Sequence, residues 1–184
     1  MAEREETELQ EQLVHLLEQK NMTIATAESC TGGMLAAKIT SVPGVSSVYA
    51  GGFVTYATEE KHKMLGVPRK ILRENGAVSK KTAKLMAAGA ARETGTDVAV
   101  SITGNAGPEA SEGKPVGLVY IGVCIDGKAV GRKYLLEGTR NEIREHACTE
   151  AMKLVIGKLT NSGERSKDCL LYTSPSPRDG LLSR

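Results

Sequence analysis

Short runs of β-branched and small apolar residues alternate with helical patterns along most of this chain, and this alternation constrains the fold more than any other feature. Strand-like runs lie at residues 22–27, 48–57 and 98–104. Helical patterns lie at residues 34–40, at 58–66 and in the stretch that Ser79 opens. An alternation of this kind is typical of a sheet that is covered by helices.

Local signals mark the ends of the chain and its turns. A leucine stripe at helical spacing predicts an amphipathic helix that Asn21 closes: Leu9, Leu13, Leu16 and Leu17. Asp126-Gly127 separates strand-like runs at 116–125 and 128–137 and predicts a hairpin, because both residue types tolerate the positive φ of a two-residue turn. The segment 139–142, Thr-Arg-Asn-Glu, has the spacing of a capping box and predicts a final helix.

Other patterns predict how the elements pack. Gly51-Gly52 indicates a bulge or a close approach in the second strand, and Thr58 is expected to cap the helix that follows. The helix after Ser79 carries a small-residue stripe suited to packing on a sheet: Ala83, Met86, Ala87 and Ala90. We therefore expect an α/β fold with a mixed sheet and helices on both faces.

Composition excludes several classes of function. Lys and Arg outnumber Asp and Glu by only 24 to 22, and the chain has one Phe, five Tyr and no Trp, so no nucleic-acid partner is expected. No apolar run approaches the ~20 residues of a membrane span, and we expect a cytoplasmic protein without a membrane partner. The four cysteines form no CxxC pair and there are three histidines, so we expect no metal and no cofactor.

The run CLLYTSPSPRD, residues 169–179, breaks with everything before it. It has neither helical nor strand periodicity, and it reads like the translation of a transposon-type sequencing adapter. A disordered Ser/Pro tail is the ordinary alternative. We therefore expect one domain at residues 1–167 and a non-native tail at residues 168–184.

Ser29 lies in the turn AESCTGG, between a strand and a helix. Thr31, Gly32 and Gly33 contribute backbone N–H groups there, which suit a phosphate or the oxyanion of acyl transfer. Ser29 is a candidate nucleophile, and a serine that caps a tight glycine turn is an equal alternative. Cys30 is a rival nucleophile, although a small residue packed under the sheet is its simpler role.

A nucleophilic serine needs a base, and no His–Asp relay is apparent among the three histidines. Lysine is the other recognised activator when burial or nearby positive charge keeps it neutral. Lys61 follows Tyr56 in TYATEEK and falls on the first turn of a helix, where a cation is disfavoured. A solvated lysine is the ordinary alternative.

The stretch SITGNAGPEASEGKPVG is the third candidate for a functional loop. Its small residues allow close backbone approach to a ligand, but it contains neither a P-loop nor a GxGxxG fingerprint. A long surface loop is the alternative.

Taken in order, AESCTGG, GGFVTYATEEK, GAVS and SITGNAGPEASEGKPVG resemble the CinA C-terminal domain family, which includes stand-alone nicotinamide-nucleotide amidohydrolases. The resemblance covers roughly residues 9–159. It implies a three-layer α/β/α sandwich with a mixed, mostly parallel sheet, and hydrolysis of nicotinamide mononucleotide to nicotinate mononucleotide and ammonia. It also implies a homo-oligomer, to whose interface the N-terminal leucine stripe would contribute.

The resemblance also implies roles for individual residues. Ser29 would be the nucleophile and Lys61 the general base, and Tyr56 would assist proton transfer or orient the pair. Thr31, Gly32 and Gly33 would meet the oxyanion. Arg140 is the first candidate for the substrate's phosphate because a guanidinium matches it as a fork, with a solvated charge as the alternative. The further candidates are Thr103, Gly104 and Lys114.

Two departures from the family pattern concern one loop. Asn105 stands where the TGxAGP motif usually has a hydrophobic residue, and EASEG stands where extra glycines are common. Larger family members carry a second domain with nucleotide pyrophosphatase activity, which we do not expect here. The alternatives to the deamidase are a Ser–Lys amidase for another small amide and a nucleotide-binding or interaction module without turnover.

Overall fold

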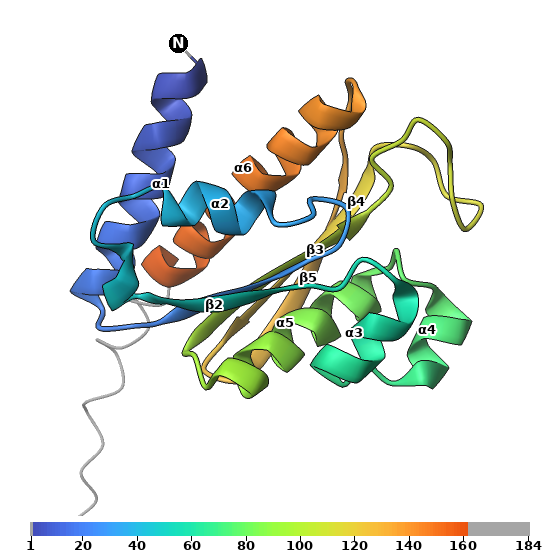
Figure 1. Ribbon diagram of the computed structural model, residues 1–184, viewed down its shortest axis with the longest axis horizontal. Helices are drawn as coiled ribbons and strands as arrows, with labels where there is room; N and C mark the ends of the chain where they lie inside the picture. The colour runs from blue at the N-terminus through green and yellow to red at the C-terminus, as the bar shows by residue number, and fades with distance from the viewer. Residues whose placement is uncertain (1, 162–184) are drawn as a thin grey trace, which may run out of the picture.

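The computed structural model describes residues 2–161, in which helices and strands alternate as predicted (Figure 1). The predicted tail at residues 168–184 and its boundary lie outside the described residues. Among the described residues, no helix is both long and apolar enough to cross a membrane. The helices are α1 (Ala2–Gln19), α2 (Met34–Thr40), α3 (Thr58–Leu65), α4 (Arg69–Asn75), α5 (Lys80–Thr94) and α6 (Arg140–Asn161), with a 3-10 turn at Val45–Ser47. The strands are β1 (Ile24–Glu28), β2 (Tyr49–Val54), β3 (Val98–Gly104), β4 (Leu118–Ile125) and β5 (Lys128–Leu135).

The strands form one mixed sheet in the order β2-β1-β3-β4-β5. β1 pairs in parallel with β2 and with β3, whereas the β3–β4 and β4–β5 ladders are antiparallel. Helices α1, α2 and α6 cover one face of the sheet, and α3, α4 and α5 cover the other (Figure 1). The three-layer α/β/α arrangement with a C-terminal hairpin is therefore confirmed.

The leucine stripe of α1 belongs to the core of its own chain. Leu13 and Leu17 are fully buried in the apolar cluster that α1 shares with α6, and Leu9 and Leu16 pack against the same cluster. Leu13 and Leu17 therefore have no surface left for a neighbouring subunit. A homo-oligomer, with the partly buried Leu9 and Leu16 at its interface, stays a prediction.

On the opposite face, α5 packs its small residues against the sheet. Ala83, Met86, Ala87 and Ala90 are fully buried, as the stripe predicted. The glycine pair of β2 also acts as predicted. The register between β1 and β2 shifts beside it, and a Cβ on Gly52 would lie 2.3 Å from the Thr26 hydroxyl oxygen.

The local turn and cap signals are confirmed at two of three positions. Asp126 and Gly127 have φ of 48° and 75° and join β4 to β5. Thr139 donates from its backbone N–H and its hydroxyl to the Glu142 carboxylate, each at 2.7 Å, which completes the capping box before α6. Thr58, in contrast, is the first residue of α3 and not its cap, because Ala57 takes that position.

Helix α4 was not predicted. It has seven residues between Pro68 and Gly76, and Leu72 is its one buried side chain. An element of this length shows too little of the 3.6-residue period to be recognised from its pattern.

Two helical glycines provide a matched test of the packing between α3 and α5. A Cβ on Gly89 of α5 would lie 2.1 Å from the backbone oxygen of Leu65, whereas a Cβ on Gly157 of α6 would meet nothing within 4 Å. We expect Gly89→Ala to lower the free energy of unfolding by about 1–3 kcal/mol, because the clash exceeds the gain in helix propensity. Gly157→Ala should raise it by about 0.5–1 kcal/mol. Urea denaturation measures both, and changes of the same sign would contradict the close approach.

Candidate active site

The candidate site lies where the three parallel strands end. The last residue of β1, Glu28, is in register with Val54 of β2 and Ile102 of β3. The chain leaves β1 toward β2 on one side and returns to β3 on the other, with the connecting helices on opposite faces (Figure 1). In open α/β sheets, ligands bind beyond the carboxyl ends of the strands at such a switch point. The turn that carries Ser29 begins at this point.

Ser29 and Lys61 meet here, although 32 residues separate them in the chain. The Lys61 amine, Nζ, lies 3.1 Å from Ser29 Oγ. It also donates to the backbone oxygens of Thr55, at 2.7 Å, and Tyr56, at 3.3 Å. Lys61 is 1 % exposed, although lysine is among the residue types most rarely buried. The ordinary alternative for Lys61, a solvated surface lysine, is therefore wrong.

Burial changes the acid–base properties of both side chains next to Ser29. Loss of hydration lowers the pKa of Lys61 to about 8, and the acidic groups Cys30 and Glu112 partly oppose that fall. Burial raises the pKa of the Cys30 thiol to about 11, since a thiolate there would lose its hydration. At neutral pH Cys30 is thus a neutral thiol, which is a poor nucleophile. Lys61 is still mostly protonated at neutral pH, but its neutral form is far more populated than in an ordinary lysine.

A cavity of about 270 Å³ opens in front of this pair. Tyr56 is 60 % exposed beside it, and its hydroxyl accepts a hydrogen bond from Arg140 Nη2 at 3.0 Å. Arg140 Nη1 also donates to the backbone oxygen of Gly107. No hydrogen bond joins the Tyr56 hydroxyl to Ser29 or Lys61 within residues 2–161. The residues that line the cavity are Ser29, Cys30, Tyr56, Thr58, Lys61, Ala77, Val78, Thr103, Gly104, Asn105, Ala106, Gly107, Glu109, Ser111, Glu112 and Arg140.

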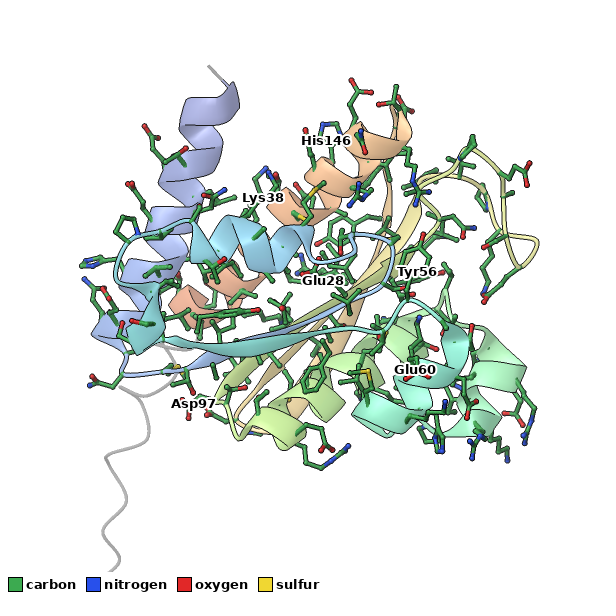
Figure 2. All side chains as sticks on the ribbon, viewed as in Figure 1. Glu28, Lys38, Tyr56, Glu60, Asp97 and His146 are labelled. Atoms are coloured by element: carbon green, nitrogen blue, oxygen red, sulfur yellow. The ribbon has the colours of Figure 1, made fainter. Side chains whose placement is uncertain are left out.

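The start of α2 is already occupied by an anion that the chain itself provides. The buried Glu28 carboxylate accepts hydrogen bonds from the backbone N–H groups of Gly33, Leu35 and Ala36, at 3.1, 3.0 and 2.9 Å. Figure 2 shows Glu28 beneath α2, at the end of the sheet where Tyr56 also lies. Because a helix N-terminus favours negative charge, Glu28 takes the place that the sequence suggested for a substrate anion.

The three predicted oxyanion donors do not line the cavity. The Gly33 N–H is bonded to Glu28, and the Gly32 N–H donates to the backbone oxygen of Ser29 at 3.1 Å. Thr31 is fully buried, and its backbone oxygen accepts from Arg144 Nη2 at 2.8 Å. The structure therefore corrects the prediction for Gly32 and Gly33, whose N–H groups are satisfied inside the protein.

Of the three residues predicted in the third loop, two line the cavity and one lies behind its wall. Thr103 and Gly104 line the cavity, but the Thr103 hydroxyl donates to the backbone oxygen of Ala77 at 2.9 Å. Lys114 does not line the cavity. Its amine donates to the backbone oxygens of Asn75, at 3.0 Å, and Val78, at 2.6 Å. Lys114 therefore supports the cavity wall and does not face a ligand.

Glu28, Asn105 and Glu112 were not predicted as functional residues. Asn105 Nδ2 donates to the backbone oxygens of Ser111 and Lys114, so it closes the loop on itself. Glu112 binds the N–H groups of the α4–α5 connection, which the sequence gives no means to foresee. Glu28 did leave a signal, since an acidic residue just before a helix start is a potential cap.

Comparison with known proteins is consistent with this architecture. The family model described as the CinA C-terminal domain matches residues 6–159. A CinA-like protein of Kosmotoga olearia is 48 % identical over 151 residues, which are 82 % of this chain and 37 % of that protein. This chain therefore spans less than two fifths of the length of this curated relative.

Solved structures match over almost their whole length. A CinA superfamily protein from Klebsiella pneumoniae aligns with a TM-score of 0.83 at 30 % identity, over 85 % of this chain and 98 % of that one. The competence/damage inducible protein CihA from Agrobacterium tumefaciens aligns with a TM-score of 0.80 at 37 % identity, over 84 % and 95 %.

The cap at the start of α2 can be tested by stability. Glu28→Ala leaves the N–H groups of Gly33, Leu35 and Ala36 without their acceptor, so we expect the free energy of unfolding to fall by roughly 2–4 kcal/mol. Glu74→Ala is the matched control, because Glu74 forms a 3.9 Å ion pair with Lys70 on the solvent side of α4. It should change stability by no more than about 0.5 kcal/mol. Equal losses in the two variants, measured by urea denaturation, would disprove the role of Glu28.

Proposed function

Because this chain belongs to the CinA C-terminal domain family, we propose that it is an amidohydrolase that converts nicotinamide mononucleotide to nicotinate mononucleotide and ammonia. The observation that carries the proposal is the 3.1 Å contact between the buried Lys61 amine and Ser29 Oγ. A hydroxyl next to a lysine of lowered pKa is the arrangement of a serine nucleophile with a lysine base.

The two backbone oxygens around Lys61 support its role as the base. A neutral amine has two hydrogens and one lone pair. If its hydrogens are donated to the oxygens of Thr55 and Tyr56, the lone pair is left for the Ser29 hydroxyl. Thr55 is itself fixed, since its N–H donates to the backbone oxygen of Glu28 at 2.8 Å. The base and the nucleophile are thus connected through the backbone hydrogen bond between Thr55, beyond β2, and Glu28, at the end of β1.

In the proposed reaction, Lys61 takes the Ser29 proton while Ser29 Oγ attacks the carboxamide carbon. The tetrahedral intermediate collapses as its nitrogen receives the proton from Lys61 and leaves as ammonia. A nicotinoyl ester remains on Ser29. Lys61 then removes a proton from water, which attacks the ester carbon, and it returns that proton to Ser29 Oγ as the ester bond breaks and nicotinate mononucleotide is released. Every proton in this sequence passes between Ser29, Lys61, water and the leaving amine.

Arg140 is the proposed partner of the substrate's phosphate. It lines the cavity, and its hydrogen bonds to Tyr56 and Gly107 hold the guanidinium at the cavity edge. In this proposal Tyr56 orients Arg140 through its hydroxyl and Lys61 through its backbone oxygen. Since the N–H groups of Gly32 and Gly33 are occupied, they are not proposed as donors to the oxyanion.

Two other functions share this geometry. A Ser–Lys amidase for another small amide would use the same pair, and the substrate alone would differ. A binding module without turnover would gain nothing from a buried lysine beside a serine, so the pair favours an enzyme. Ammonia release from nicotinamide mononucleotide, compared with nicotinamide riboside and free nicotinamide, tests the deamidase against both alternatives.

The nucleophile can be identified with adjacent substitutions. We expect Ser29→Ala to reduce ammonia release from nicotinamide mononucleotide by at least about a thousandfold, because the attacking oxygen is lost. Binding of the nucleotide, measured by calorimetry, should persist if its phosphate provides much of the affinity. Cys30→Ser should keep activity of the same order as the unmodified protein. A loss in Cys30→Ser equal to that in Ser29→Ala would move the nucleophile to the thiol.

The base can be identified from the pH profile. Only the neutral amine accepts the Ser29 proton, so turnover should rise by about tenfold per pH unit in the acidic limb and level off above an apparent pKa of about 8. Lys61→Arg should be nearly inactive, because a guanidinium stays protonated throughout the accessible range. A Lys61→Arg variant with a near-normal rate, or a profile that rises only toward the ordinary lysine pKa, would refute this assignment.

A further inference from the structure

An ion pair in the loop after β3 fastens one wall of the cavity. Lys114 Nζ lies 2.9 Å from Glu112 Oε2. The Glu112 carboxylate also accepts from the backbone N–H groups of Ala77, at 2.8 Å, and Val78, at 3.1 Å. Lys114 donates to the backbone oxygens of Asn75 and Val78. Together the two side chains satisfy four backbone groups of the connection between α4 and α5.

The backbone conformation of this loop fixes the position of the Glu112 side chain. Ser111 and Lys114 form a β-bridge, and Glu112 and Gly113 between them have φ of 55° and 65°. A tight turn of this type sends the Glu112 side chain onto Gly76, where an added Cβ would lie 2.2 Å from Glu112 Oε2. There is no room for a larger residue between the carboxylate and the connection. The charge of Glu112 is therefore held in one position.

That position lies in the wall of the cavity that holds the candidate base. Glu112 and Lys61 line the same cavity. The hydrogen bonds of Glu112 keep its pKa below the ordinary value, so the carboxylate is ionised at neutral pH. An ionised carboxylate across the cavity favours the protonated form of Lys61 and opposes the effect of burial.

We propose that Glu112 is a positioning residue for the reaction, which acts through the negative charge that it holds across the cavity from the Lys61 amine, and that Lys114 moderates this charge. The inference rests on the proposed function for its effect on turnover. Its effect on the protonation of Lys61 does not depend on that function.

Other charged or titratable groups near Lys61 differ from Glu112 in position or in charge. Arg140, Glu109, Tyr56 and the Cys30 thiol, which is neutral at neutral pH, also line the cavity. The charged side chains of the helices around Lys61 have partners of their own. Three form ion pairs at the surface: Glu59 with Arg69, Glu60 with Lys63, and Arg92 with Glu93. Arg92 also donates to the backbone oxygen of Leu65, and the His62 ring is hydrogen-bonded to the backbone oxygen of Val67. Among the groups that face the cavity, Glu112 is the acid whose direction is fixed by backbone hydrogen bonds.

The two members of the ion pair should have opposite effects on Lys61. Glu112→Gln removes a negative charge, so the protonated amine loses support and its pKa falls further. Lys114→Gln removes a positive charge and leaves Glu112 less compensated, so the pKa of Lys61 rises. Both substitutions weaken the attachment of the loop to the end of α4 and the α4–α5 connection, each through its own hydrogen bonds. If the ion pair only held the loop in place, the two substitutions would therefore shift the pKa of Lys61 in the same direction.

The experiment measures the pKa of Lys61 in two ways for the full chain. The first is the pH profile of ammonia release from nicotinamide mononucleotide. The second is the pH titration of the Lys61 ¹³Cε signal in protein labelled at lysine, assigned by its loss in Lys61→Arg. We expect the midpoint to move down by about half a pH unit in Glu112→Gln and up by a similar amount in Lys114→Gln. Glu74→Gln, which removes an exposed charge from α4, is the matched control and should leave the midpoint unchanged.

The two readouts separate failure of this inference from failure of the proposed function. Opposite NMR shifts without ammonia release would support the charge effect and reject the deamidase. Midpoints that stay fixed, or that move in the same direction in the two variants, would overturn the inference even if both variants remain active. Thermal unfolding of each variant identifies any fold loss, in which case Glu112→Asp, which keeps the charge, should restore the original midpoint.

Discussion

The buried amine of Lys61 is the interaction on which the rest of the site depends. Loss of hydration moves its pKa from 10.5 to about 8, which corresponds to a loss of about 3.5 kcal/mol of stability, at roughly 1.4 kcal/mol per pKa unit. Below pH 8 the amine is protonated in both the folded and the unfolded chain, so the folded state bears the full free-energy cost of burying a charged amine. As the pH rises from 8 to 10.5 the folded amine becomes neutral and the penalty is relieved. A fold that retains such a residue sacrifices stability for a lysine that can accept protons.

Backbone oxygens reduce the free-energy cost of burying the Lys61 amine, because they accept its hydrogen bonds. The oxygens of Thr55 and Tyr56 lie just beyond β2, and Ser29 lies just beyond β1. These strand ends are adjacent because β1 and β2 are parallel neighbours, so the sheet itself sets the distance between nucleophile and amine. Glu28 adds a second constraint, since its carboxylate ties the end of β1 to the first turn of α2. The sheet therefore fixes where Ser29 and the two backbone acceptors of the Lys61 amine lie.

Features governed by neighbouring residues could be predicted from the sequence. The Asp126-Gly127 turn, the capping box at Thr139 and the small stripe of α5 each depend on a few adjacent residues, and each is confirmed. The meeting of Ser29 and Lys61 could be anticipated only from the family resemblance, because no local pattern connects strand ends that are 32 residues apart. The glycines of AESCTGG misled for a physical reason. A helix N-terminus attracts any anion, and the sequence alone does not tell whether the anion is a substrate or Glu28.

The loop after β3 shows how two unexpected residues can form one structural feature. Asn105 replaces the hydrophobic residue that the family pattern led us to expect, and it is 5 % exposed, so its amide must find partners inside the protein. Its side-chain oxygen accepts from the Ser111 hydroxyl at 2.5 Å, and its nitrogen donates to the backbone oxygens of Ser111 and Lys114. Ser111 belongs to EASEG, which is the other departure from the pattern. The polar residue in the wall is thus compensated by a polar residue in the loop, and the same contacts fix the turn that holds Glu112 against the α4–α5 connection. The chemistry of this wall follows from the two departures together, because the Ser111 hydroxyl is the side-chain donor to the Asn105 oxygen.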